Sequence, residues 1–148
     1  MDPIYLGFFG KAIVIGLSGV GSIYGVTIVA NAAIGALKKN PDPFGAYLVL
    51  MTPPTTNGLY GFLGYFIFSS FLTPEITIFQ ATAIFFSCLS LGVLNFFSSY
   101  RQSQVCAHAI AAVASGNDIF GKALIVVAYV ELYAIIGLAA VYLVAGAL

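Results

Sequence analysis

Residues 123–138 read ALIVVAYVELYAIIGL, an apolar run with one carboxylate, Glu131, near its centre. The run lies within residues 119–148, in which Lys122 is the only other charged residue. A charge at the centre of a membrane helix costs about 2.5–3.5 kcal/mol on insertion scales, and such a residue usually marks an ion or proton path. The alternative is a protonated Glu131 that hydrogen-bonds to a neighbouring helix and only helps the helices pack.

The composition places the whole chain in a membrane. Of its 148 residues, 61% are hydrophobic and only 7% are charged, and the mean hydropathy is +1.05. Soluble domains carry about 25% charged residues, so a soluble fold of this length could not cover so much apolar surface. The net charge is zero, and without a basic patch we expect no nucleic-acid partner.

Four segments are long and apolar enough to span a bilayer, which takes about 20 residues. They cover about residues 4–37, 44–72, 76–115 and 119–148, and short Gly, Pro, Asn and Asp-rich breaks separate them. The first segment lacks the positive start of a cleaved signal peptide, so we interpret it as a retained helix. The sequence predicts an all-α membrane protein, one transmembrane domain over residues 1–148, with two tandem hairpins at about 4–72 and 76–148.

The charges at the ends of these segments predict an orientation. Lys38, Lys39 and Lys122 lie at the two hairpin loops, whereas Asp2 and Glu75 lie on the other side. By the positive-inside rule, the hairpin loops face the cytoplasm and both termini lie on the opposite side of the cell (plasma or inner) membrane.

The two halves also look like a duplication with an offset of 76 residues. Phe-Gly at 44–45 matches Phe-Gly at 120–121, and Gly61 matches Gly137. The same register pairs Thr55 with Glu131. Both hairpins run in the same direction, so the repeat is parallel and not inverted. A duplicated ion-binding hairpin whose first half has lost its carboxylate would have this pattern.

Small residues favour close packing of the first and third helices, because helices in lipid associate through small-residue faces. The two series are Ser18, Gly21, Ser22 and Gly25, and Ser99, Ser103, Ala107, Ala111 and Ser115. The second and fourth helices carry bulkier side chains, and Phe68 is expected to face lipid. This pattern predicts two concentric layers with the first and third helices inside. A compact four-helix monomer is the alternative.

Polar groups that could surround Glu131 gather at a break in the second segment. Pro53 and Pro54 donate no backbone hydrogen bond, and Thr56, Asn57 and Tyr60 follow them. A hard cation needs several oxygen ligands, which Thr56, the amides of Asn57 and Gln102, the Pro53 carbonyl and Glu131 could supply. Tyr60 could hydrogen-bond to Glu131. Interhelical hydrogen bonding without an ion remains the alternative.

The remaining candidates for ligand chemistry are isolated. Cys88 and Cys106 lie in apolar runs, where thiols behave as small hydrophobic groups more often than as a disulfide. His108 has no Cys or acidic residue at metal-binding spacing, so a packing role is expected.

Two stretches resemble a known family. Residues 54–62, PTTNGLYGF, resemble the second helix of the proteolipid (K or c) subunit of V-type rotary ATPases, and residues 129–137, YVELYAIIG, resemble its fourth helix. The resemblance implies a bacterial or archaeal rotor-ring subunit that carries Na⁺, or alternatively H⁺, and performs no chemistry itself. It implies as partners identical protomers in a ring, a membrane stator subunit, central-stalk subunits and lipid, and no cofactor other than the bound ion.

The resemblance also implies a set of site residues. Thr56, Gln102 and Glu131 match sodium ligands of the family, Tyr60 matches the tyrosine that supports the Glu, and the ligating carbonyl falls on Pro53. Asn57 stands where the family has the longer Gln. Arg101, next to Gln102, would defeat ion exchange if it paired permanently with Glu131, so it is expected to face the ring lumen or a neighbouring protomer.

Two other classes of function stay open at this point. A small proton-coupled multidrug-type antiporter also has four helices and one membrane Glu, although that Glu typically lies in the first helix. A purely structural membrane protein would carry no ion.

Overall fold

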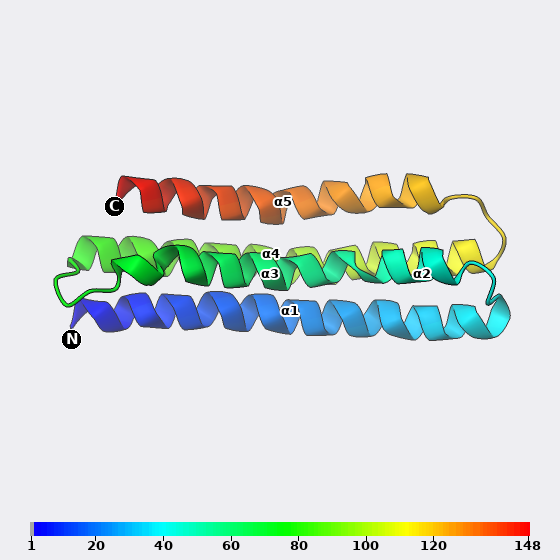
Figure 1. Cartoon of the computed structure of the whole chain (residues 1–148), viewed down its shortest axis with the longest axis horizontal. Coiled ribbons are helices and arrows are strands. Elements are labelled where there is room, and N and C mark those ends of the chain that lie inside the picture. Colours follow the sequence, from blue (N-terminus) through cyan, green and yellow to red (C-terminus); the bar gives the residue numbers. More distant parts are fainter. Residues whose placement is uncertain (1) are drawn as a thin grey trace.

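The computed structural model describes residues 2–148, and they are helical almost throughout (Figure 1). The elements are α1 (Pro3–Lys39), α2 (Phe44–Met51), α3 (Pro53–Ile67), the 3₁₀ turn η1 (Phe68–Phe71), α4 (Ile78–Ala114) and α5 (Phe120–Ala147). Helices α1, α4 and α5 each form one column, and α2 and α3 follow end to end in a further column (Figure 1). The all-helical prediction is confirmed.

The helix ends follow local sequence chemistry. Asp2 caps α1 by accepting a hydrogen bond from the Ile4 amide at 3.2 Å, and Pro3 occupies the first turn, where its missing N–H has no cost. Thr77 and Gln80 form a reciprocal capping box at the start of α4. Gly116, with φ of 87°, adopts a left-handed conformation directly after α4. These signals set where the columns begin and end.

Three helices, α1, α4 and α5, are long and apolar enough to cross a membrane. The expected second span over residues 44–72 is not one helix, because α2 ends at Met51 and α3 starts at Pro53. Prolines 53 and 54 cannot donate to the preceding turn, so the hydrogen-bond ladder is interrupted there. The predicted break at Pro53 and Pro54 is confirmed.

Helices α1 and α4 pack with their backbones in close approach. A Cβ atom added to Gly10 would lie 2.7 Å from the Phe85 Cα, and one added to Gly21 would lie 2.6 Å from the Phe96 Cα. No side chain larger than hydrogen fits at either point. The tight packing of the first and third predicted helices is therefore confirmed, and it joins the two hairpins.

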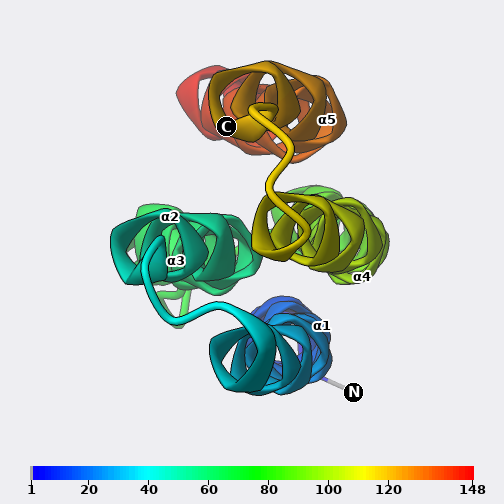
Figure 2. The ribbon, with the colours of Figure 1, turned by 90° about the vertical axis from the view of Figure 1, so that its right-hand side faces the viewer.

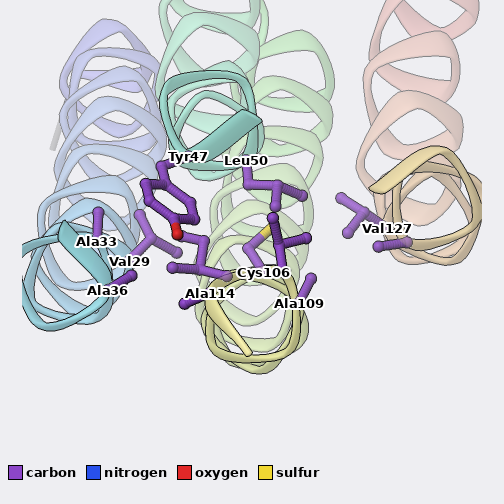
Figure 3. Close-up of a cluster of buried hydrophobic side chains, with 12 residues drawn as sticks. Val29, Ala33, Ala36, Tyr47, Leu50, Cys106, Ala109, Ala114 and Val127 are labelled. Atoms are coloured by element: carbon purple, nitrogen blue, oxygen red, sulfur yellow. The ribbon is translucent and has the colours of Figure 1, made fainter. Parts of the chain in front are cut away.

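Two apolar clusters fill the space between the columns. Near the hairpin loops, Tyr47 and Leu50 of α2 lie in a cluster with residues of α1, α4 and α5 such as Val29 and Cys106 (Figure 3). At the opposite end, Phe68 packs with residues such as Ile84 and Leu91. Each cluster draws on both hairpins, so the four columns form one packed unit.

Phe68 is fully buried, which contradicts its expected lipid-facing position. It begins η1, and a 3₁₀ turn has about three residues per turn in place of 3.6. The phase of the helix therefore changes at Phe68. Phe62 and Phe66 of α3 remain 52% and 66% exposed and are the better examples of outward-facing side chains.

Lys11 of α1 is buried without an acidic partner among residues 2–148. Its ammonium group donates to the Ser69 hydroxyl at 2.8 Å and lies 3.9 Å from the centre of the Tyr65 ring. A hydroxyl and an aromatic face together satisfy part of what a buried cation loses in hydration. Lys11 thereby ties the start of α1 to the end of the α3 column.

The columns repeat in space as the sequence repeats along the chain. Seen end-on, the step from α1 to α4 resembles the step from α3 to α5 (Figure 2). Both hairpin loops lie at one end of the molecule, and the two termini lie at the other (Figure 1).

We predict that Gly21→Leu prevents α1 from reaching α4, because the added side chain would meet the Phe96 backbone. Overpacking of this kind costs about 1–3 kcal/mol or more. Size-exclusion chromatography in mild detergent should show a reduced yield of folded protein and intact assemblies. Phe62→Leu, at an exposed position, should have little effect. Equal yields from both variants would contradict the close-packing interpretation.

Candidate ion-binding site

The site is built around the backbone break between α2 and α3. The Pro54 carbonyl accepts hydrogen bonds from Ser22 Oγ of α1 at 2.9 Å and from Ser99 Oγ of α4 at 2.8 Å. The Pro53 carbonyl accepts from Thr56 Oγ1 at 2.8 Å. Pro53 and Pro54 form the first turn of α3, and their carbonyls receive hydroxyl groups from three helices. These bonds fix the start of α3 against α1 and α4.

Glu131 of α5 is held by two hydroxyl groups of α3. Its Oε1 atom accepts from Thr56 Oγ1 at 2.7 Å and from Tyr60 OH at 2.8 Å. Thr56 and Tyr60 lie one turn apart on the same face of α3. The single Thr56 hydroxyl proton can point either to Glu131 or to Pro53. The Oε2 atom accepts no hydrogen bond from the residues that the structure describes, so one carboxylate oxygen is available to a ligand.

A second polar pair lies immediately beside these contacts. Asn57, the residue after Thr56, donates from Nδ2 to Gln102 Oε1 of α4 at 2.9 Å. Both side chains are fully buried, yet Asn57 Oδ1 and Gln102 Nε2 have no partner in the described part of the chain. A buried polar atom without a partner costs about 1–3 kcal/mol. An amide oxygen left in this way can coordinate a cation.

The α5 backbone is attached to α4 next to the carboxylate. Ser98 Oγ donates to the Val130 carbonyl at 3.2 Å. Glu131 itself is only half-buried. The carboxylate is therefore positioned from several sides while keeping a route to the surface of the molecule.

The structure brings the predicted site residues together. Glu131, Thr56 and Tyr60 are joined by hydrogen bonds, Pro53 joins them through Thr56, and Asn57 joins Gln102 from the adjacent position on α3. Their role as ion ligands stays a prediction.

Two neighbours of these residues point elsewhere. Thr55 is exposed and donates to the Thr52 carbonyl at 2.6 Å. Arg101 is exposed and donates to Gln104 Oε1 at 3.1 Å. Neither side chain bonds to Glu131.

Sequence reasoning noted Ser22, Ser98 and Ser99 as small or polar residues but did not predict the hydrogen bonds by which they organise the site. Their residue type indicates only small, polar helix contacts, because spacing does not reveal which carbonyl each hydroxyl will meet. Across residues 2–148, no three His, Cys, Asp or Glu side chains lie close enough together to hold a metal. Cys88 and Cys106 are buried free thiols, and His108 is exposed.

Two regions of the chain match one known family. Residues 9–68 and residues 85–144 each match the family of the ATP synthase C subunit. The second region starts at 85 where the first starts at 9, and it ends at 144 where the first ends at 68, so both bounds are offset by 76 residues. This is the register in which Thr55 pairs with Glu131, and the family match confirms the duplication.

Curated relatives point the same way. The chain is 33% identical over 138 residues to the A-type ATP synthase subunit K of Methanocaldococcus jannaschii, covering 93% of this chain and 60% of that protein. It is 33% identical over 120 residues to the V-type sodium ATPase subunit K of Enterococcus hirae, covering 81% of this chain and 77% of the relative. The chain thus spans less than two thirds of the length of the archaeal relative.

We predict that a hydrophobic carbodiimide modifies Glu131 alone among the five acidic residues. Such reagents attack protonated carboxyls, and the other four, Asp2, Asp42, Glu75 and Asp118, are exposed at the ends of the columns. Peptide mass spectrometry should find one adduct, on the peptide that contains Glu131. Glu131→Gln should remove it. An adduct of equal yield on Glu75 would show that reactivity does not single out the membrane carboxylate.

Proposed function

The chain belongs to the family of the ATP synthase C subunit, and we propose that it is a rotor-ring subunit of a rotary ATPase that carries one Na⁺ per copy on Glu131. It is a membrane subunit that performs no bond chemistry itself. Both curated relatives named above are subunits of ATP-linked complexes, and one is named as part of a sodium ATPase. The family membership is shown by the match, and we propose the identity of the ion and the residues that bind it.

One observation carries the proposal. Glu131 presents a carboxylate oriented by Thr56 and Tyr60, and the residue next to Thr56, Asn57, has a buried carbonyl oxygen without a partner. A carboxylate for charge and neutral oxygens for coordination form the ligand set that a hard cation requires. Thr56 Oγ1, Glu131 Oε2 and the Pro53 and Gln102 oxygens would complete the shell.

Sodium is favoured over a proton by the amide pair. A proton carrier needs one carboxyl and a hydrogen-bond partner, which Glu131 and Tyr60 already supply. Two fully buried amides, Asn57 and Gln102, would then stay partly unsatisfied at a cost in stability. With Na⁺ bound, the Asn57 oxygen would coordinate the ion and would no longer lack a partner. Carriage of H⁺ on the same carboxylate is the second candidate.

The geometry supports loading and release at the outer surface of a ring. In the proposed assembly α1 and α4 form the inner layer and the α2–α3 column and α5 form the outer one, so Glu131 lies near the outside. An occupied carboxylate is neutral, and a neutral group crosses lipid at far lower cost than a charged one. An emptied site would need a charged or aqueous surface beside it, which a membrane stator subunit would provide.

The remaining parts of the proposal concern the orientation of this assembly. The α2–α3 column acts as the fourth membrane span, with its break buried against Ser22 and Ser99. The two hairpin loops face the cytoplasm because their lysines favour that side, and they would contact the central stalk. The antiporter alternative has no support in the family match.

We predict that Glu131→Gln abolishes ion-coupled ATP turnover and leaves insertion and ring assembly intact. The substitution removes a charge from an apolar helix at similar volume, so α5 should insert at least as easily. ATPase assays of the reconstituted complex and native mass spectrometry of the extracted ring measure the two effects. Full coupled activity in this variant would rule out Glu131 as the ion carrier.

The shell is tested through Gln102. Gln102→Ala should raise the Na⁺ concentration for half-maximal ATP-driven activity by about tenfold or more, equivalent to ~1.4 kcal/mol or more. Thr56→Val should shift it in the same direction, because the change removes one ligand oxygen at similar volume. The measurement is the Na⁺ titration of ATPase activity in proteoliposomes.

Asn57→Gln is the matched reverse test. The longer amide should maintain or improve Na⁺ affinity if position 57 supplies a ligand. If Na⁺ dependence is unchanged in all three variants and activity is still lost in Glu131→Gln, the rotor carries protons and not sodium.

A further inference from the structure

The seam between α3 and α5 that holds Glu131 continues past the ion site as an open groove. Ile135 of α5 lies one turn beyond Glu131, and with Leu63 of α3 it lines an apolar hollow of about 460 Å³. A second hollow, of about 530 Å³, follows toward the end of the molecule where the termini lie (Figure 1). The two hollows share Ile67 and Tyr142 as lining residues, so they form one groove.

The groove has the length and the lining that suit an acyl chain. Along α5 it extends from Ile135 to Gly146, about 16 Å at 1.5 Å per residue, and half of a bilayer's hydrocarbon core measures about 15 Å. Phe66 and Leu143 along its sides are 66% and 71% exposed. A Cβ added to Gly146 would have nothing within 4 Å, so the groove is open at this end.

Hydroxyl groups gather at the end of the groove that is farther from Glu131. Ser69 and Ser70 of η1 line the second hollow, and both are exposed. Tyr142 lines it from α5, and tyrosine is enriched at the level of lipid headgroups. The groove is therefore apolar near the ion site and polar near the termini, which is the distribution of polarity in a phospholipid.

A cation without a counter-charge lies beside Ser69. The Lys11 ammonium group donates one hydrogen bond to Ser69 Oγ at 2.8 Å and faces the ring of Tyr65. An ammonium group has three N–H donors, and Lys11 is only 4% exposed and has no acidic partner among residues 2–148. A buried charge is costly unless an opposite charge accompanies it. An anion at the exposed serines would supply that charge.

We propose that an anionic phospholipid occupies this groove, with one acyl chain between α3 and α5 and its phosphate at Ser69 and Ser70, beside Lys11. The apolar length, the exposed hydroxyl groups and the unpaired cation each match one part of such a molecule. A neutral lipid would leave Lys11 without a counter-charge. The end of the acyl chain lies at Ile135, where it keeps water from Glu131 along this side of the seam. The inference goes beyond the proposed rotor function and does not depend on which ion is carried.

Native mass spectrometry of the intact assembly tests the site. The protein is extracted in mild detergent, washed free of loosely held lipid, and mixed with dioleoyl phosphatidylglycerol or dioleoyl phosphatidylcholine. The two lipids have the same acyl chains, but only the first carries a net negative charge. We expect phosphatidylglycerol to be retained at least about fivefold better, the factor that one basic residue near an anionic surface provides.

Two substitutions locate the bound lipid. Gly146→Leu places a side chain in the groove without a clash at its Cβ, so it should remove one retained phosphatidylglycerol per chain. Gly121→Leu is the matched control, because position 121 is equally open but lies at the other end of α5. Lys11→Met should abolish the preference for phosphatidylglycerol. Lys122→Met, which removes an exposed lysine near a hairpin loop, should leave that preference unchanged.

The outcomes distinguish this site from lipid bound elsewhere. Loss of one lipid per chain in Gly146→Leu but not in Gly121→Leu supports the groove, and loss of the preference in Lys11→Met alone supports the anionic headgroup. Unchanged retention in Gly146→Leu overturns the proposal, because lipid on any other surface, including the inside of a ring, does not depend on position 146. Equal retention of both lipids by the parent protein overturns the assignment of Lys11. The rotor function stands or falls separately, with the Glu131 variant.

Discussion

The structure depends on the hydrogen bonds gathered at a helix break inside a membrane. Lipid offers no hydrogen bonds, so the polar groups at the break must bond within the protein. Pro53 and Pro54 cannot donate to the Val49 and Leu50 carbonyls, and Thr52 Oγ1 donates to Val49 instead. The carbonyls of the two prolines themselves accept bonds from Ser22, Ser99 and Thr56, which fix α3 against α1 and α4. Because Thr56 also contacts Glu131, the bonds at the break help to position the carboxylate.

The duplication explains why the chain has one site and not two. The two hairpins share their internal contacts, including a serine bonded to the carbonyl that precedes position 55 or 131. They differ at that position itself, which is Thr55 in the first hairpin and Glu131 in the second. The site also takes polar groups from α3 and α4, so it lies between the hairpins. A carboxylate costs several kcal/mol at this depth, and the chain bears that cost once.

The polar groups of the site differ in how completely they are hydrogen-bonded. The Pro54 carbonyl accepts a bond from each of two serines, which fixes the backbone. Asn57 and Gln102 are equally buried but keep one unpaired atom each. An incompletely satisfied network is unfavourable when empty, and the proposed Na⁺ would give Asn57 Oδ1 a partner. This division suits the proposed function, in which the site keeps its shape while its ion is exchanged.

The sequence alone determined the membrane class and the 76-residue duplication, placed Glu131 in the middle of an apolar run, and singled out Thr56, Tyr60, Asn57 and Gln102 as candidate neighbours, because hydropathy, repeat spacing and residue type can be read along the chain. Tertiary structure decided which groups meet. It paired Asn57 with Gln102, sent Arg101 to Gln104, bonded Ser22 and Ser99 to Pro54, and turned Phe68 into the core. These outcomes depend on the rotation of each helix about its axis and on the change of phase at the break and the 3₁₀ turn. Helical periodicity specifies the faces of a helix but does not specify the neighbour that each face will meet.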